Sequence, residues 1–404
     1  MTETRFITAD EAEPYLDAVR IGFGQDPSTD DDRVDRFLAI NPLETCSAAF
    51  DRGRVVATFG SYDLDMTVPG AASVAAAGTS HVTVHPTHRR RGILRDLMTL
   101  HLDQARDRGQ SMAALWASEE RIYGRFGYGP ATWALDIAMS ARTVDLPPVA
   151  EGVEVHPLPT AEAATVLAPL FEAGRIDVAG RFVRSDAWWA NRTLYDHAHR
   201  SDGERAQRYV VAERDGEVVG YLIYRLSDGG DWNDGNTGVV ELMTRDDAAR
   251  RALWHFVTNI DLFRNVRWWN APVDDPVLIE AERFRSAKHT TFDAVWVRPL
   301  DVATLLSTRG YERDGALVLG VDDPAGYTGG RFRLEVVDGK GSCSSTTDEP
   351  SVTLGVADLG RLYLGAGSAL TLARAGRIDG APEAVATLGD LLATRRQPHV
   401  AEVF

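Results

Sequence analysis

The chain has 404 residues, which predicts two to four domains at about 100–200 residues each. Hydrophobic residues make up 44 % and charged residues 25 %, an ordinary balance for a globular protein, and the lack of any run of about 20 apolar residues argues against a membrane segment. The formal net charge of −16 argues against nucleic acid as the main partner, and two cysteines are too few for a disulfide framework.

Residues 1–145 have the pattern of an α/β domain. The first residues are polar and acidic and lack the basic and apolar segments of a signal peptide, so we expect a cytoplasmic location. Helical patterns at 9–21 and 31–40 precede alternating apolar segments that are typical of strands. A strongly amphipathic segment at 93–108 predicts a helix. The prolines of 141–152 indicate a linker at the end of this domain.

A weak internal repeat follows the linker. Segment 51–66 resembles 213–228, and 80–98 resembles 239–257, each pair having the same order of strand, turn and amphipathic helix. We interpret 146–297 as a second copy of the same fold, which has lost the glycine and the arginine cluster at the turn. Chance similarity between two α/β segments is the alternative.

The last part of the chain, 298–404, has a different pattern. A strand, a glycine turn and a second strand are expected at 332–343, and small helices packed on a sheet at 358–376. The chain then ends in an apolar tail, and such tails are often docked on the protein. The sequence therefore predicts an α+β domain after two α/β domains.

The most specific local feature is the segment VTVHPTHRRRGILRDLM. The strand Val82–Val84 must stop at Pro86, and the basic turn Arg89–Arg91 leads through Gly92 into the amphipathic helix. The first amides of a helix lack internal partners, and with the helix dipole they form an anion site that glycine lets a phosphate approach. Solvated arginines at a helix start are the alternative, but they would oppose the dipole. The pattern favours a pyrophosphate site.

This segment resembles the acyl-CoA loop of GCN5-related N-acetyltransferases, in which the pattern is Arg/Gln-x-x-Gly-x-Gly/Ala. Residues 89–94 match its first four positions, while Leu94 departs from the small residue found there. Together with ASEERIYGRFGYGPATW at 117–133 and the final Phe404, the chain resembles the Eis (enhanced intracellular survival) family of aminoglycoside acetyltransferases. The resemblance implies two acetyltransferase-like domains, 1–145 and 146–297, and a sterol-carrier-like domain after them.

The resemblance also implies roles for single residues. Those expected to bind the co-substrate acetyl-CoA are Val82, Val84, Arg89, Arg90, Gly92, Ile93 and Ser118. Tyr123 would be the general acid, and the carboxylate of Phe404 the general base or the group that orders a water molecule. Members of the family form hexamers, acetylate several amines of one aminoglycoside, and in some cases acetylate lysine side chains.

The chemistry of amine acetylation is consistent with these roles. Direct attack of an amine on a thioester needs no protein nucleophile, but the departing thiolate needs a proton. A tyrosine with a pKa near ~10 can donate one to a thiolate whose conjugate acid lies near ~8.5. Tyr123 and Tyr128 both lie in the matching segment, and we prefer Tyr123 because the family pattern matches at that position.

The acceptor side is less clearly marked. A terminal carboxylate with a pKa near ~3.3–3.7 is a weak base unless it is buried. His81 on the strand before the turn is the alternative base, although a lone strand histidine is more often a packing residue. The acidic segment 26–37, which begins with Asp26, and Glu402 are candidates to hold an ammonium group. A solvated loop is the alternative for that segment, and the histidine spacing indicates no metal site.

Three functions remain open from the sequence. The first is acetylation of cationic amines such as aminoglycosides, and the second is acetylation of lysine in proteins or peptides at the same site. The third is acyl-CoA binding without turnover, against which the complete cofactor turn and Tyr123 both argue.

Overall fold

The computed structural model describes residues 2–28, 30–196, 203–231 and 233–404. The chain forms two compact units, each made of separate stretches of sequence. The first contains Met1–Thr132, Ala294–Arg395 and Glu402–Phe404, and the second contains Trp133–Asp293 and Arg396–Ala401.

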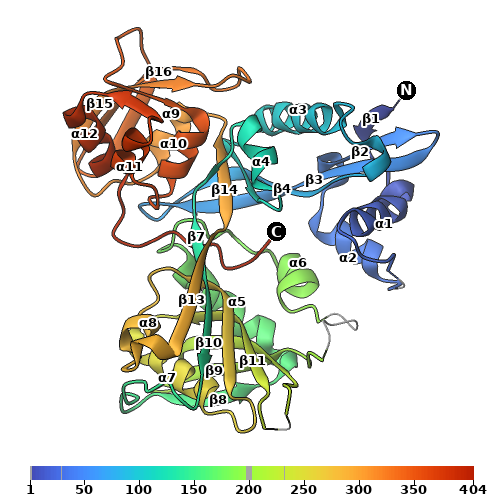
Figure 1. Cartoon of the computed structure of the whole chain (residues 1–404), viewed down its shortest axis with the longest axis vertical. Coiled ribbons are helices and arrows are strands. Elements are labelled where there is room, and N and C mark those ends of the chain that lie inside the picture. Colours follow the sequence, from blue (N-terminus) through green and yellow to red (C-terminus); the bar gives the residue numbers. More distant parts are fainter. Residues whose placement is uncertain (1, 29, 197–202, 232) are drawn as a thin grey trace. The chain divides into compact units, whose positions relative to one another are not determined.

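The first unit contains a seven-stranded sheet with helices on both faces (Figure 1). In spatial order its strands are β1 (Glu3–Phe6), β2 (Cys46–Asp51), β3 (Arg54–Val68), β4 (Ala72–Val84), β5 (Met112–Trp116), β14 (Val295–Pro299) and β6 (Gly129–Pro130). Its helices are α1 (Ala12–Gly22), α2 (Arg33–Ile40), α3 (Ile93–Asp107) and α4 (Glu120–Tyr123).

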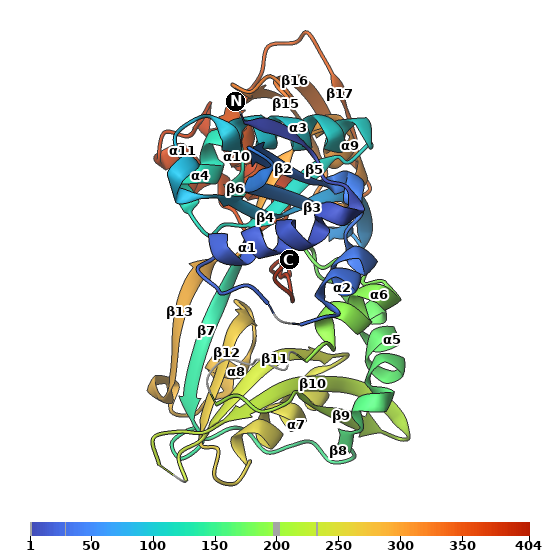
Figure 2. The same cartoon turned by 90° about the vertical axis from the view of Figure 1, so that its right-hand side faces the viewer.

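Alternation along the strands builds a separate apolar core on each face of this sheet. On one face Tyr15 of α1 and Phe37 of α2 pack on Ala48 of β2. On the other, Leu97 of α3 packs with Phe59 of β3, and Figure 2 shows α1 and α3 on opposite sides of the sheet. The helix expected at 93–108 is therefore confirmed as α3.

The first unit also contains a five-stranded sheet that follows the first in sequence. Its spatial order is β17 (Lys340–Ser345), β16 (Gly330–Val337), β15 (Gly315–Asp322), β18 (Val352–Gly355) and β19 (Ile378–Gly380). The helices with it are α9 (Val302–Thr308), α10 (Val356–Tyr363), α11 (Ala369–Arg374) and α12 (Pro382–Leu392). This is the α+β pattern expected for the end of the chain.

The second unit repeats the architecture of the first sheet. Its strands in spatial order are β13 (Ala287–Asp293), β7 (Trp133–Ser140), β12 (Asn265–Pro272), β11 (Asn236–Thr244), β10 (Glu217–Ser227), β9 (Arg208–Arg214) and β8 (Glu154–Leu158). Its helices are α5 (Ala163–Arg175), α6 (Asp186–Trp188), α7 (Asp247–Thr258) and α8 (Val277–Glu280). Phe171 of α5 and Leu253 of α7 belong to the cores on opposite faces of this sheet.

The two seven-stranded sheets exchange one strand each. β7 leaves the first unit directly after β6 and lies between β12 and β13 of the second sheet. β14 follows β13 and lies between β5 and β6 of the first sheet. The sheets therefore differ from the consecutive segments 1–145, 146–297 and 298–404 that the sequence suggested.

None of the helices in the described ranges is both long enough and apolar enough to cross a lipid bilayer.

Candidate active site

The site begins where two parallel strands of the first sheet separate. β4 and β5 pair from Ala76 opposite Met112 to Thr79 opposite Leu115, after which β4 continues to Val84 paired with β3 only. At this point β4 also has a β-bulge against β3. Between the pairs Thr58–Thr83 and Gly60–Ser80, two residues of β4 lie opposite a single residue of β3. Bulges of this kind redirect a strand next to a functional site. The freed edge of β4 offers backbone groups to an extended ligand.

The basic turn after β4 has the geometry expected for an anion site. A short 3₁₀ helix, Pro86–His88, ends the strand, and Gly92 caps the start of α3 with φ of 86°. The first intrahelical bond runs from the Asp96 amide to the Gly92 carbonyl at 3.1 Å, so the three preceding amides lie before the hydrogen-bond ladder. Arg90 also takes a positive φ of 63°, which tightens the turn. The predicted cradle is thus a well-defined turn at the start of a fifteen-residue helix.

The freed end of β4, the basic turn, the start of α3 and the segment 118–126 line a cavity of about 1120 Å³. Predicted residues that line it are Val82, Val84, Arg89, Arg90, Gly92, Ile93, Ser118 and Tyr123. Strand edge, basic turn and phenol therefore lie around one space. Its size and its cationic end suit a long ligand with a diphosphate at one end.

Tyr123 and Tyr128 have different surroundings. Tyr123 lines the cavity, and burial raises the pKa of its phenol while a hydrogen bond with Ser118 opposes that shift. The Tyr128 hydroxyl lies 3.2 Å from Thr79 Oγ1 inside the core, and burial raises its pKa to about 12. The rings are 6.2 Å apart in an edge-to-face arrangement, so Tyr128 supports Tyr123. The geometry favours Tyr123 as the proton donor.

His81 lies on the opposite side of β4, on the face covered by α1 and α2. It has a positive φ of 56°, and its ring contacts Tyr15 and Phe37 at centroid distances of 6.1 and 5.6 Å. Its Nε2 lies 3.3 Å from the Tyr62 hydroxyl. Among the described residues it is not part of the cavity lining. The structure therefore places His81 in an aromatic cluster.

Phe404 lies beside the point where β4 and β5 separate. It is 4 % exposed, and its ring lies 3.3 Å from where a Cβ atom on Gly78 would stand. Ala77 packs on the α3 side of the sheet, so Gly78 faces the other side, which is also the side of His81. Phe404 and His81 therefore share the face of β4 that α1 and α2 cover. Glu402, two residues earlier, is half-buried.

The acidic segment contains an internal ion pair, between Arg36 and Asp30. Its other arginine, Arg33, contacts two carboxylates of α1, Glu13 at 2.8 Å and Asp17 at 3.2 Å. Asp26 is exposed. The solvated-loop interpretation thus accounts for much of this segment, although Gly22 and Phe23 just before it line the cavity.

Two arginines at the cavity were missed by reasoning from sequence. Arg95 lies in the first turn of α3 and lines the cavity. A Cβ atom added to Gly92 would lie 3.0 Å from the Arg95 Nη2 atom. Arg125 follows Tyr123 on the turn after α4 and also lines the cavity. The spacing of Arg95 from Gly92 places it on the same side of the helix start, and this signal could have identified it.

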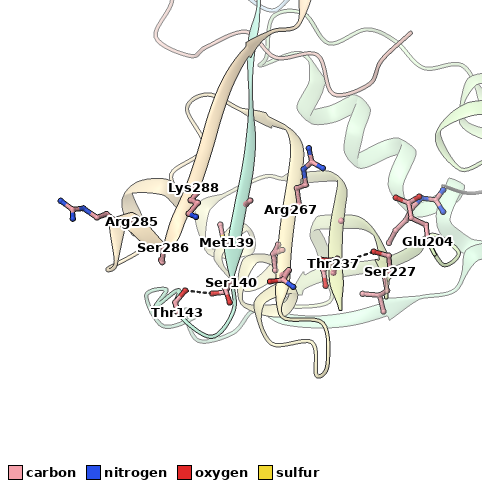
Figure 3. A pocket seen from close by; sticks show the side chains of 17 residues that line it. Met139, Ser140, Thr143, Glu204, Ser227, Thr237, Arg267, Arg285, Ser286 and Lys288 are labelled. Atoms are coloured by element: carbon pink, nitrogen blue, oxygen red, sulfur yellow. Dashed lines mark hydrogen bonds between the residues drawn. The ribbon is translucent and has the colours of Figure 1, made fainter. Parts of the chain in front are cut away.

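A second cavity, of about 730 Å³, lies in the second unit on one face of its sheet (Figure 3). Arg267, Arg285 and Lys288 are among its lining residues, and Arg267 is paired with Asp136 at 2.6 Å. None of the predicted site residues in the described ranges lines this cavity. The candidate active site is therefore the cavity of the first unit.

Comparison with protein families agrees with this architecture. Residues 3–131 and 180–299 each match an acetyltransferase (GNAT) domain, and residues 302–401 match a sterol carrier protein domain. Fold and cavity together define an acetyltransferase of the GNAT type, a class that uses acetyl-CoA. The enzyme class predicted from the sequence is confirmed.

Relatives that match over most of the chain identify the family. An N-acetyltransferase of Streptomyces griseus is 35 % identical over 418 residues, covering 100 % of this chain and 99 % of the relative. The N-acetyltransferase Eis of Mycobacterium tuberculosis is 33 % identical over 327 residues, covering 78 % and 77 %. The crystal structure of Eis1 from Mycobacterium abscessus matches 100 % of both chains with a TM-score of 0.84 and 29 % identity. The chain belongs to the Eis-like family of GNAT N-acetyltransferases.

Proposed function

We propose that this enzyme transfers the acetyl group of acetyl-CoA directly to an amine of a cationic small molecule such as an aminoglycoside. The observation that carries the proposal is the shared lining of one cavity by the freed β4 edge, the basic turn and Tyr123. In this proposal Val82 and Val84 bind the pantetheine arm through their backbone. Arg89 and Arg90, with the amides that follow Gly92, bind the diphosphate.

The reaction balances without a covalent enzyme intermediate. The amine nitrogen bonds to the thioester carbonyl carbon, the carbon–sulfur bond breaks, and the thiolate takes the phenolic proton of Tyr123. The amine loses one proton, which is accepted by a base or by water. Tyr123 is reprotonated from solvent before the next turnover.

The carboxylate of Phe404 is proposed to hold the acceptor ammonium group and to receive its proton through water. This assignment is supported by the position of Phe404, which is buried beside Gly78 where β4 and β5 separate. His81 lies on the same face of β4 and is the alternative base. Asp26 and Glu402 are proposed to attract the cationic acceptor, at longer range.

A panel of acceptors tests the proposal, with release of free thiol from acetyl-CoA as the readout. Several aminoglycosides, a linear polyamine and a lysine-containing peptide would be compared at equal concentration. We expect the highest kcat/KM for an aminoglycoside. Turnover confined to the peptide would favour lysine acetylation, and binding of acetyl-CoA without thiol release for any amine would overturn the proposal.

The expected homohexamer and cytoplasmic location rest on family resemblance and the sequence. Light scattering on the purified protein tests the first, and the proposed reaction does not depend on it.

A further inference from the structure

The second sheet contains the same strand separation that opens the cofactor cleft of the first. β11 and β12 pair in parallel from Asn236 opposite Asn265 to Val239 opposite Trp268 and then diverge, as β4 and β5 do. β12 is also irregular after Trp268, where its register against β7 shifts. In the first sheet the corresponding space is a cavity of about 1120 Å³. In the second, the space left is about 10 Å³.

The chain's own tail fills the second groove. His399 and Ala401 line the small remaining space, and both lie in the stretch Arg396–Ala401 that belongs to this unit. The Asn270 side-chain amide donates to the Val400 carbonyl at 2.9 Å, and the His399 ring lies 3.0 Å from the Asn270 carbonyl. The His399 amide donates to the Ala179 carbonyl at 2.9 Å. The tail thus lies between the diverging strands, in the space where a pantetheine arm would lie, and is held there by bonds to Asn270 and Ala179.

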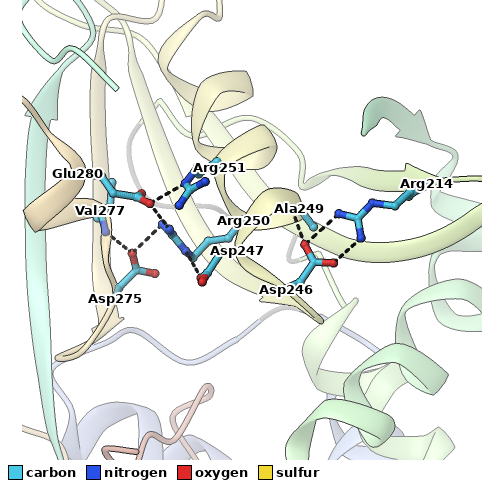
Figure 4. Close-up of polar contacts among 9 residues, drawn as sticks. All are labelled: Arg214, Asp246, Asp247, Ala249, Arg250, Arg251, Asp275, Val277 and Glu280. Atoms are coloured by element: carbon cyan, nitrogen blue, oxygen red, sulfur yellow. Dashed lines mark hydrogen bonds and ion pairs between the residues drawn. The ribbon is translucent and has the colours of Figure 1, made fainter. Parts of the chain in front are cut away.

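The start of the neighbouring helix is occupied by an internal carboxylate. α7 corresponds to α3, but its cap is Asp246, which accepts from the Ala249 amide at 2.9 Å (Figure 4). Arg214 holds the same carboxylate at 2.7 Å. Where α3 presents a glycine after three arginines, α7 presents Asp246 followed by Asp247. A negative charge already satisfies the amides that a diphosphate would require.

We propose that the second acetyltransferase-like domain is a binding site for the chain's own C-terminal tail. Residues 399–401 occupy the place of the pantetheine arm and Asp246 the place of the diphosphate. The comparison of the tail with a pantetheine arm rests on the acetyl-CoA site proposed for the first domain. The contacts of the tail with the second domain do not depend on that proposal. Asn270 contacts the tail at both His399 and Val400, and it is therefore the residue chosen to test the tail's attachment.

Hydrogen exchange of the 396–401 segment in the full chain tests this role. Asn270→Ala removes the bond to Val400 and should speed exchange about tenfold. His399→Ala, which alters only the tail, should do the same. The matched control is Asn265→Ala on the same strand, whose amide bonds the Asp234 carbonyl instead, and it should leave tail exchange unchanged. Unchanged exchange in both Asn270→Ala and His399→Ala would overturn the proposal.

Calorimetric titration with CoA separates this inference from the proposed function. A filled second groove predicts one CoA for each chain, and two would overturn the tail-binding role. A chain that binds no CoA would contradict the proposed function. The hydrogen-exchange experiment would still test whether the second domain binds the tail.

A second inference rests on a buried ion pair in the first unit. Arg298 of β14 and Asp323 after β15 are both fully buried, with Nη2 2.8 Å from Oδ2. Arg298 Nε donates to the Phe126 carbonyl at 2.6 Å, and its Nη1 donates to the Pro299 carbonyl and to Thr328 Oγ1. Asp323 in turn accepts from the amides of the turn that follows it. The pair is therefore fully satisfied in its buried position.

Phe126 ends the turn that carries Tyr123. Its carbonyl lies at the end of the 3₁₀ helix Gly124–Phe126, where carbonyl groups lack helical partners and a cation binds well. Gly127 follows with φ of 83°, and a Cβ there would stand 2.9 Å from Val356 of α10 and 3.2 Å from Arg298 Nε. A Cβ on Gly129 would stand 1.9 Å from the Ala357 carbonyl. The sterol-carrier-like domain thus packs directly on the Tyr123 turn.

We infer that this domain braces the Tyr123 turn through Arg298 and Asp323, which are positioning residues. The inference rests on the proposed role of Tyr123. Asp323→Asn should speed hydrogen exchange in 119–128 about tenfold and lower kcat, with KM for acetyl-CoA changed by less than about twofold. A more solvated phenol has a lower pKa, so the alkaline fall of kcat should begin at lower pH.

Arg309→Lys provides the matched control. Arg309 is a buried arginine of the same domain that binds the carbonyls of Tyr363 and Leu392, away from the Tyr123 turn. Its loss should destabilise the domain without changing exchange in 119–128. Unchanged exchange in Asp323→Asn, or an equal change in Arg309→Lys, would overturn the brace. If exchange is faster in Asp323→Asn and not in Arg309→Lys, but Asp323→Asn keeps full kcat, the brace would be supported and the proposed role of Tyr123 would be contradicted.

Discussion

Replacing Tyr123 with phenylalanine removes one hydroxyl and leaves the ring that packs 6.2 Å from Tyr128. Since the ring and the cavity wall are retained, we expect KM for acetyl-CoA to stay within about twofold of the wild type. A general acid contributes about 10²–10⁴ in rate, so kcat should fall by that factor. This corresponds to about 2.7–5.4 kcal/mol in activation free energy at about 1.36 kcal/mol per decade.

The pH dependence gives a second measure of the same role. The donor must be protonated, and burial raises the pKa of Tyr123 above its usual value of 10. Wild-type kcat should therefore hold to about pH 10 and fall above it. The variant should lose this alkaline fall, because its residual rate does not depend on the phenol.

Tyr128→Phe is the matched control in the thiol-release assay. It loses the contact with Thr79 Oγ1 in the core, which should cost about 1 kcal/mol in unfolding free energy. Its kcat should remain within about twofold of the wild type, since Tyr128 lies outside the cavity lining described here. A Tyr123→Phe enzyme with normal kcat and an unchanged alkaline limb would refute the reasoning.

Three further perturbations address other parts of the molecule. Gly92→Ala places a Cβ atom on a residue with φ of 86°, 3.0 Å from the Arg95 guanidinium, and so strains the turn. KM for acetyl-CoA, measured by steady-state kinetics, should rise about tenfold. An unchanged KM would count against the diphosphate site. Adding three residues after Phe404 should lower kcat at least about tenfold, because the terminal carboxylate would then no longer belong to the residue buried beside Gly78. Full activity of the extended enzyme would dismiss its carboxylate. Burial lowers the pKa of His101 to about 3 from 6.5, so the unfolded chain binds its proton first as the pH falls. Stability is then complete above about pH 6.5 and declines below it, by about 2 kcal/mol between pH 7 and pH 5 for this residue, and urea unfolding of a His101→Gln variant should show a smaller decline.

Local features of the site could be predicted from sequence because local rules determine them. Pro86 cannot continue a strand, Gly92 permits the positive φ of the turn, and the amphipathic pattern at 93–108 specifies α3. The placement of Tyr123 at the cavity followed from a motif that spans only a few residues of the same segment.

Features that join distant segments could not be predicted in this way. The apolar strands β7 and β14 have no local pattern that says which sheet each will enter, since pairing depends on partners far along the chain. The Arg298–Asp323 pair crosses 25 residues without any periodic signal. The apolar tail was expected to dock, but its groove could be recognised only once β11 and β12 were seen to diverge.

The exchange of β7 and β14 has a consequence for how this chain can be made. During synthesis the first sheet lacks the strand between β5 and β6 until Val295–Pro299 leaves the ribosome. The N-terminal domain therefore cannot finish folding before almost three quarters of the protein has been translated. A recombinant fragment of residues 1–145 would keep unpaired strand edges and an unpaired apolar β7, and it should aggregate. Catalytic competence is thus a late property of translation.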